Sequence, residues 1–271
     1  MEYNFNPALA FAKITTQWID YAEKTKANKW VVGVSGGKDS AVVAALAVEI
    51  FGADNVELVM MPNGTMKSED IAAVEELVEL LGIDEYNDID ISKSYHSILN
   101  NIKENGIELS EDTKINLAPR LRMSTLYALS QSIGGRPVNT SNLSERMLGY
   151  STLWGDNCGA FAPIADLTTT EVIELGKWLG LSDNLINKIP EDGLSGKSDE
   201  EKLGIKYSEL DKFIRIGEYD SEFMRRRYYE LFNGSKFKRD MINVPMAKMP
   251  WNNEFITNAG QKERMNKIIL G

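Results

Sequence analysis

The sequence is poor in the side chains that most often build metal centres, disulfides and nucleophilic triads. Its 271 residues include one cysteine, Cys158, and one histidine, His96. A single cysteine excludes an internal disulfide and a cysteine-based zinc site. His96 lies in a polar segment, and we interpret it as a surface residue rather than as the base of a Ser-His-Asp triad.

An excess of basic charge and long apolar runs are also missing. The chain has 30 Lys and Arg against 40 Asp and Glu, a net charge of −10, so its surface as a whole repels nucleic acid and anionic membranes. No segment approaches 18 uninterrupted apolar residues, and the N-terminus lacks a signal-peptide pattern. We therefore expect a cytoplasmic protein with neither a nucleic-acid nor a membrane partner.

The residues that are present suffice for a large core. The apolar fraction is 43%, and we predict one domain over residues 1–271 with no glutaminase domain. Apolar spacing predicts strands that alternate with helices, which is typical of an α/β fold with a parallel sheet and right-handed crossovers. The predicted strands are 31–34, 56–61, 86–91 and 136–140. The predicted helices include 7–27, 41–50, 67–81, 170–179, 207–216 and 219–232, and another helix opens at 116–127. Ser68 is the predicted N-cap of helix 67–81, and Pro119 lies in the first turn of the helix that opens at 116–127.

A glycine-rich turn follows the first predicted strand. The segment 35–40 reads Ser-Gly-Gly-Lys-Asp-Ser and leads into an apolar helix. Strand, glycine turn and helix start together point backbone N–H groups and a helix dipole at an anion. The spacing is neither that of Walker A nor that of the dinucleotide fingerprint. It resembles the pyrophosphate loop of the N-type ATP pyrophosphatases, which adenylate a carbonyl oxygen and pass the activated group to a nitrogen nucleophile.

Two acids follow the carboxyl ends of predicted strands. Asp39 ends the glycine turn, and Glu145 ends the segment Thr140-Ser-Asn-Leu-Ser-Glu145 after the fourth strand. Ligands of parallel sheets bind at the carboxyl ends of the strands. If the fourth strand lies beside the first, the two carboxylates and triphosphate oxygens make a reasonable Mg²⁺ site.

Four other features are open to two interpretations. Met61, at the end of the second strand, either supports an adenine or belongs to the core. Arg120 and Arg122 lie on different faces of a helix, so one can clamp phosphate and the other a structural carboxylate. The segment 191–201 is either a linker or a lid over the active site. A basic cluster of Lys236, Lys238 and Arg239 is by default an exposed tail.

The motifs taken together, in their order, resemble ammonia-dependent NAD synthetase. The resemblance covers roughly residues 30–240 and rests on segments 35–40, 119–123, 140–145, 149–150, 155–156 and 198–211. It implies a doubly wound, Rossmann-like parallel sheet (adenine nucleotide alpha-hydrolase-like) with a helical C-terminal elaboration, and a homodimer. It also implies that ATP and Mg²⁺ activate deamido-NAD, and that ammonia displaces AMP to give NAD.

The resemblance also implies roles for individual residues. Asp39 and Glu145 match the metal acids, and Asp156 matches a catalytic acid that handles ammonium near the nicotinate end. Arg120, Asp156 and Lys238 match contacts to the dinucleotide. The implied ATP contacts are Gly33, Ser35, Gly36, Gly37, Lys38, Asp39, Ser40, Met61 and Thr140.

Departures from the family pattern lie in the dinucleotide half. Leu153, Ala160, Thr169 and Phe237 stand where relatives usually carry a basic residue, an acid, a lysine and a histidine. The alternatives are therefore another adenylating ATP pyrophosphatase with a different small carboxylate or carbonyl substrate, and a non-catalytic nucleotide-binding protein. A separate protein that supplies the ammonia is compatible with the sequence.

Overall fold

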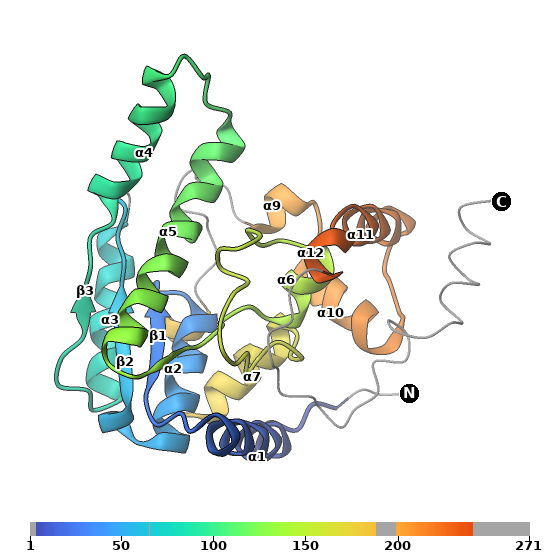
Figure 1. Ribbon diagram of the computed structural model, residues 1–271. Helices are drawn as coiled ribbons and strands as arrows, with labels where there is room; N and C mark the ends of the chain where they lie inside the picture. The colour runs from blue at the N-terminus through green and yellow to red at the C-terminus, as the bar shows by residue number, and fades with distance from the viewer. Residues whose placement is uncertain (1–3, 65, 188–198, 241–271) are drawn as a thin grey trace.

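The computed structural model describes residues 4–64, 66–187 and 199–240 (Figure 1). The strands are β1 (Trp30–Val34), β2 (Val56–Met60), β3 (Asn87–Asp88) and β4 (Arg136–Pro137), and η1 (Ala53–Asn55) is a short 3₁₀ helix. The first helices are α1 (Pro7–Thr25), α2 (Lys38–Phe51), α3 (Ser68–Leu80), α4 (Ser92–Glu104), α5 (Glu111–Ser132) and α6 (Leu143–Leu148). They are followed by α7 (Thr169–Trp178), α8 (Asp183–Ile186), α9 (Asp199–Leu203), α10 (Tyr207–Ile216), α11 (Glu222–Gly234) and α12 (Lys236–Asp240).

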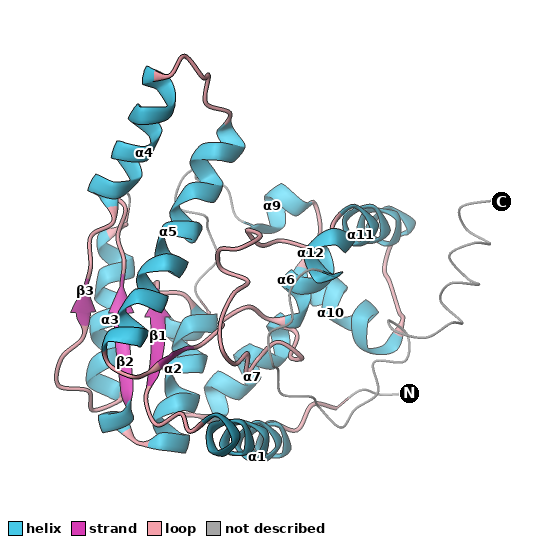
Figure 2. Cartoon of the chain, viewed as in Figure 1, coloured by secondary structure: helices cyan, strands magenta, loops and turns pink. Residues whose placement is uncertain are grey.

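The four strands form one parallel sheet in the order β3-β2-β1-β4. Trp30 pairs with Val56 on one side and with Arg136 on the other. The sheet is small and helices surround it (Figure 2). The predicted parallel α/β fold is confirmed, and β4 does lie beside β1, so the segments that follow these strands emerge at the same edge.

Helices cover both faces of the sheet, and alternation along the strands decides which residues face which layer. Val32, Val34 and Leu58 face a large core that includes α1, α2 and α7. Val31 and Val59 face a second layer, made by α4 and α5. The glycine turn after β1 is therefore supported from both sides by packed apolar side chains.

A separate apolar cluster lies beside the sheet and contains α6. Leu143, Met147 and Leu148 of α6 pack with residues of α10 and α11, including Leu210, Ile214, Met224 and Tyr228. Figure 1 shows these C-terminal helices to one side of the sheet. Since α6 has only six residues, its stability comes from this packing and not from its own hydrogen bonds.

Several predicted boundaries were wrong. The helix predicted to open near Pro119 begins earlier, with Ser110 as N-cap, and Pro119 lies inside α5; the acids after Ser110 are a start signal that outweighs the proline. Ser68 is the first residue of α3 and not its N-cap, which is Lys67. The third strand is shorter than 86–91 because it lies at the edge of the sheet and pairs with β2 alone.

Other predictions can be compared directly with the structure. His96 is exposed on α4, as predicted. The segment predicted as a linker or lid, 191–201, lies outside the described residues except for its last three, which begin α9. Within the described part of the chain, no helix combines the length and the apolar character needed to cross a bilayer.

Candidate functional site

The glycine turn at the end of β1 admits no side chain at its first glycine. Gly36 has a φ of 75°, and a Cβ placed there would lie 2.6 Å from the carbonyl oxygen of Asp70. The Ser40 hydroxyl donates to the Gly37 carbonyl at 2.9 Å, and the Ser35 backbone N–H donates to the Ser40 hydroxyl at 3.3 Å. Gly37 is the N-cap of α2, and no side chain of the described residues caps this helix. The helix start is therefore shaped to receive an anion.

Lys38 is buried and forms an ion pair with its neighbour. Its side chain is 4% exposed, and Nζ lies 2.8 Å from Oδ2 of Asp39. Burial lowers the pKa of Lys38, but the negative charges of Asp39 and Glu145 outweigh it and the pKa is raised. Lys38 is therefore a fixed positive charge among the acids of the site.

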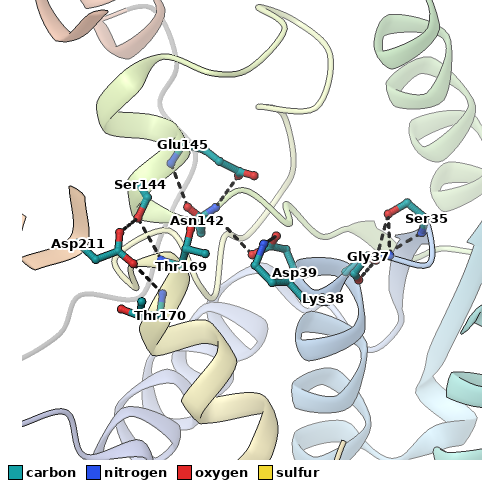
Figure 3. Close-up of polar contacts among 11 residues, drawn as sticks. Ser35, Gly37, Lys38, Asp39, Asn142, Ser144, Glu145, Thr169, Thr170 and Asp211 are labelled. Atoms are coloured by element: carbon teal, nitrogen blue, oxygen red, sulfur yellow. Dashed lines mark hydrogen bonds and ion pairs between the residues drawn. The ribbon is translucent and has the colours of Figure 1, made fainter. Parts of the chain in front are cut away.

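Asn142 connects the two predicted metal acids (Figure 3). Its amide nitrogen Nδ2 donates to Oδ1 of Asp39 at 3.0 Å, across 103 residues of sequence. Its Oδ1 accepts from the backbone N–H of Glu145 at 3.0 Å, and its own backbone N–H donates to Oε2 of Glu145 at 3.1 Å. This is a capping box at the start of α6. One fully buried amide thus fixes Asp39 and Glu145 relative to each other.

The surroundings of Glu145 disfavour its charged form, even with Lys38 nearby. Burial and the negative charge of Asp39 raise the pKa of Glu145 well above its ordinary value, although Lys38 opposes this. A bound divalent cation would remove that repulsion. No group of three or more His, Cys, Asp or Glu in the described ranges is placed to hold a metal ion. Two carboxylates alone fit Mg²⁺, which usually takes its other ligands from water and substrate phosphates.

A buried carboxylate on α10 holds the residue next to Glu145. Ser144 donates to Oδ1 of Asp211 at 2.5 Å, and the backbone N–H of Thr170 donates to Oδ2 at 2.7 Å. The backbone N–H of Thr169 donates to the Ser144 hydroxyl at 3.0 Å. Figure 3 shows Asp211 facing both Ser144 and Thr170. Burial raises the pKa of Asp211 to about 6. Asp211 therefore ties α6, the start of α7 and α10 into one unit.

Asp156 lies in a tight loop after α6. Its Oδ1 accepts from the backbone N–H of Thr152 at 2.7 Å, and Nδ2 of Asn139 donates to its carbonyl at 2.9 Å. A Cβ at Gly155 would lie 2.9 Å from Thr152, so the loop has no room for a larger residue there. The residue keeps an exposed surface, but protein atoms crowd its carboxyl group and this desolvation raises the pKa of Asp156 to about 6.

Three cations surround this loop, and in the described structure they donate to backbone carbonyls. Nε of Arg120 donates to Leu153 at 3.2 Å, and Nε of Arg122 to Met61 at 3.0 Å. Nζ of Lys238 donates to the carbonyls of Gly149 and Ser151. The prediction that the basic cluster is an exposed tail was wrong for Lys238, and also for Arg239, which donates to Met147 and Ser235. A phosphate or carboxylate of a substrate offers these cations a charged acceptor in place of a neutral one.

The remaining predicted ATP residues lie on strand β1 or shortly after strands β2 and β4. Met61 is 5% exposed and packs in the α4–α5 layer. Gly33 lies on β1, where an added Cβ would be 3.3 Å from Met61. Thr140 follows β4 and is partly exposed, three residues after the strand ends.

Sequence reasoning missed Asn142 and Asp211. Asn142 lies three residues before Glu145, and this spacing is the signal of a capping box. Its side-chain contact with Asp39 spans 103 residues, and no local sequence pattern predicts such a contact. Asp211 carries no local signal at all, because its partners, Ser144 and Thr170, belong to two other helices.

Comparison with known proteins gives a consistent result. A sequence model described as NAD synthase matches residues 11–243. The NH(3)-dependent NAD(+) synthetase of Pyrococcus horikoshii is 36% identical over 260 residues, which are 95% of this chain and 94% of the relative. The structure of NMN synthetase from Francisella tularensis has a TM-score of 0.81 at 32% identity and covers 89% of this chain and 99% of its own. The structure of NH3-dependent NAD synthetase from Campylobacter jejuni, in complex with nitrate, has a TM-score of 0.70 at 28% identity with the same coverage.

Proposed function

This chain belongs to the NAD synthase family, and from that premise we propose that it amidates deamido-NAD with ammonia at the expense of ATP. The products are NAD, AMP and pyrophosphate. The observation that carries the proposal is the arrangement around Asn142, which fixes Asp39 and Glu145 beside the glycine turn. The same arrangement argues against a non-catalytic nucleotide-binding protein, because a binder has little use for two acids held together at an energetic cost.

The first step activates a carboxylate, which is a poor acyl donor. Its oxygen attacks the α-phosphorus of ATP, and pyrophosphate leaves. Backbone N–H groups of the turn, Ser35, Ser40 and buried Lys38 hold the phosphates, with Gly33, Met61 and Thr140 around the rest of ATP. Asp39 and Glu145 would hold Mg²⁺, which would disperse the charge that develops on the leaving pyrophosphate. Positioning and electrostatics carry the rate, with no covalent intermediate on the protein.

The second step forms the amide. Ammonia attacks the carbonyl carbon of the adenylate, and AMP leaves with the bonding electrons. Asp156, with a pKa of about 6, is mostly ionised at neutral pH, so it can hold ammonium and accept the proton that ammonia must lose. Arg120 and Lys238 exchange their carbonyl partners for the acceptor's phosphates. We also expect a homodimer, which sedimentation at micromolar concentration will test.

A product assay tests the function. The protein is incubated with ATP, Mg²⁺, deamido-NAD and ammonium, and NAD, AMP and pyrophosphate are measured together. We expect NAD and AMP in equal amounts. AMP and pyrophosphate without NAD would mean that only activation is correct, and no cleavage of ATP would contradict the assignment for this acceptor.

A second candidate differs only in the acceptor. The NMN synthetase of Francisella tularensis has the higher of the two TM-scores, 0.81 against 0.70 for the NAD synthetase of Campylobacter jejuni. In this chain Leu153, Ala160 and Phe237 depart from the family pattern at positions that the resemblance assigns to the dinucleotide, and Thr169, beside Ser144, departs from it as well. Both observations favour a smaller acceptor, nicotinate mononucleotide, which is deamido-NAD without its AMP half. The same assay with both acceptors decides: the true substrate is the one with the higher kcat/KM.

A further inference from the structure

Tyr207 is the first residue of α10, and its hydroxyl is buried. The residue is 5% exposed. Its backbone N–H donates to Oε1 of Glu200 at 2.8 Å. Its hydroxyl, however, finds no hydrogen-bond partner in residues 4–64, 66–187 and 199–240. Buried hydroxyls in folded proteins nearly always have a partner, so each exception calls for an explanation.

Tyr207 packs in the same apolar cluster as Leu143, Met147 and Leu148 of α6, the helix that carries Glu145. Burial raises the pKa of Tyr207, and the carboxylates of Glu145, Asp199 and Asp39 raise it further, as does the hydroxyl of Tyr150. The hydroxyl of Tyr150 donates to Oδ1 of Asp199 at 2.8 Å, so the phenol that bonds to Asp199 is Tyr150 and not Tyr207. The Tyr207 hydroxyl consequently stays protonated and offers a hydrogen rather than a charge.

Tyr207 is also held firmly in place. Asp211, one turn later on α10, bonds to Ser144 on α6 and to Thr170 on α7. Another turn along, Arg215 forms an ion pair with Glu171 in which each side chain is 2% exposed. A rigid helix cannot easily move to give its first residue a partner. The hydroxyl is therefore fixed where a ligand would meet it.

We propose that Tyr207 is a binding residue whose hydroxyl donates a hydrogen bond to a phosphate oxygen of the nucleotide held at Asp39 and Glu145. A phosphate suits a protonated phenol because it brings acceptor oxygens and no hydrogen. Bound at the metal acids, it also arrives with a cation that offsets the carboxylates nearby. The inference rests on the proposed ATP site but not on the identity of the acceptor.

The Tyr207→Phe variant removes this hydroxyl alone. Calorimetry with Mg²⁺ and a non-hydrolysable ATP analogue should show affinity about tenfold weaker, the cost of one hydrogen bond to a charged oxygen. The urea midpoint of the free protein should not fall, because the hydroxyl has no partner to lose among the residues that the structure describes. Tyr228→Phe is the matched control: Tyr228 is also buried in the α6–α10–α11 cluster, but the ionisable groups near it are Tyr229 and Arg239 and not the carboxylates of the site. It should leave the affinity unchanged.

The result that supports the proposal is weaker binding of the analogue without a lower urea midpoint. Unchanged affinity, a lowered midpoint, or the same loss of affinity in Tyr228→Phe each overturns it. The wild-type product assay is a separate measurement. Absence of NAD there with intact binding of the analogue would contradict the proposed function while leaving this inference standing.

Discussion

The two halves of the proposed site, one for the nucleotide and one for the acceptor, are built in different ways. In the nucleotide half, charged and amide side chains bond to one another: Lys38 to Asp39, and Asp39 to Asn142. In the acceptor half, Arg120 and Lys238 donate to backbone carbonyls. The first arrangement is complete before ligand arrives, and the second leaves cations that can change partners. The difference implies that activation of a carboxylate is fixed by the fold, whereas the choice of carboxylate is adjustable.

The largest effect should come from the nucleotide half. Asp39→Ala removes a metal acid and the partner of both Lys38 and Asn142, so AMP release should fall by at least about 10³-fold. Asp54→Ala is the control, since this exposed acid lies in η1 at the opposite edge of the sheet. An unchanged rate in Asp39→Ala would refute the metal assignment.

Asp156→Asn tests whether the acceptor half acts in the second step alone. Asp156→Asn should slow NAD formation by about 10²-fold, while a first turnover of pyrophosphate persists. Because the pKa of Asp156 is raised to about 6 and only its carboxylate holds ammonium, wild-type kcat/KM for ammonium should fall as pH drops through 6. This fall in kcat/KM at low pH should be absent in Asp156→Asn. If pyrophosphate release falls equally with NAD formation, the two halves are not separate.

Asn142→Ala should disturb both metal acids without removing either. We expect a loss of about 1 kcal/mol in the free energy of unfolding, typical of a missing N-cap. Half-maximal activity should also need about tenfold more Mg²⁺, the cost of a lost hydrogen bond to a charged group. Ser110→Ala removes the N-cap of α5 and is the matched control: it should cost similar stability and leave the Mg²⁺ requirement alone. An equal change in that requirement would assign the Asn142 effect to stability.

The smallest effect should come from tuning the acceptor half. Phe237 is 52% exposed, so Phe237→His should leave the free energy of unfolding within about 0.5 kcal/mol of wild type. A new hydrogen-bond donor should lower KM for deamido-NAD by about threefold, roughly 0.6 kcal/mol, with KM for ATP unchanged. If KM for ATP shifts as much, the halves do not divide as described.

The sequence predicted the parts of the molecule that short-range patterns encode. Apolar spacing located β1, β2 and most helices, and the Ser-Gly-Gly motif located the tight turn after β1, because these depend on neighbours in the chain. The helix around Pro119 was misplaced because a tolerated proline was given more weight than the cap at Ser110. The contacts of Asn142 with Asp39, of Asp211 with Ser144 and of Lys238 with Gly149 join segments 67 to 103 residues apart. Such contacts follow from packing, which no local pattern records.

The packing of α6 has a consequence for how the protein is made. A ribosome releases the chain from its N-terminus, so the glycine turn and Asp39 emerge long before the helices that stabilise Glu145. Six residues cannot hold a helix by themselves, and Asp211 follows Ser144 by 67 residues. During synthesis the residues of the glycine turn are therefore released while α6, which carries Glu145, still lacks the helices that it packs against. We expect Glu145 to reach its place beside Asn142 and Asp39 only after α10 has left the exit tunnel and docked.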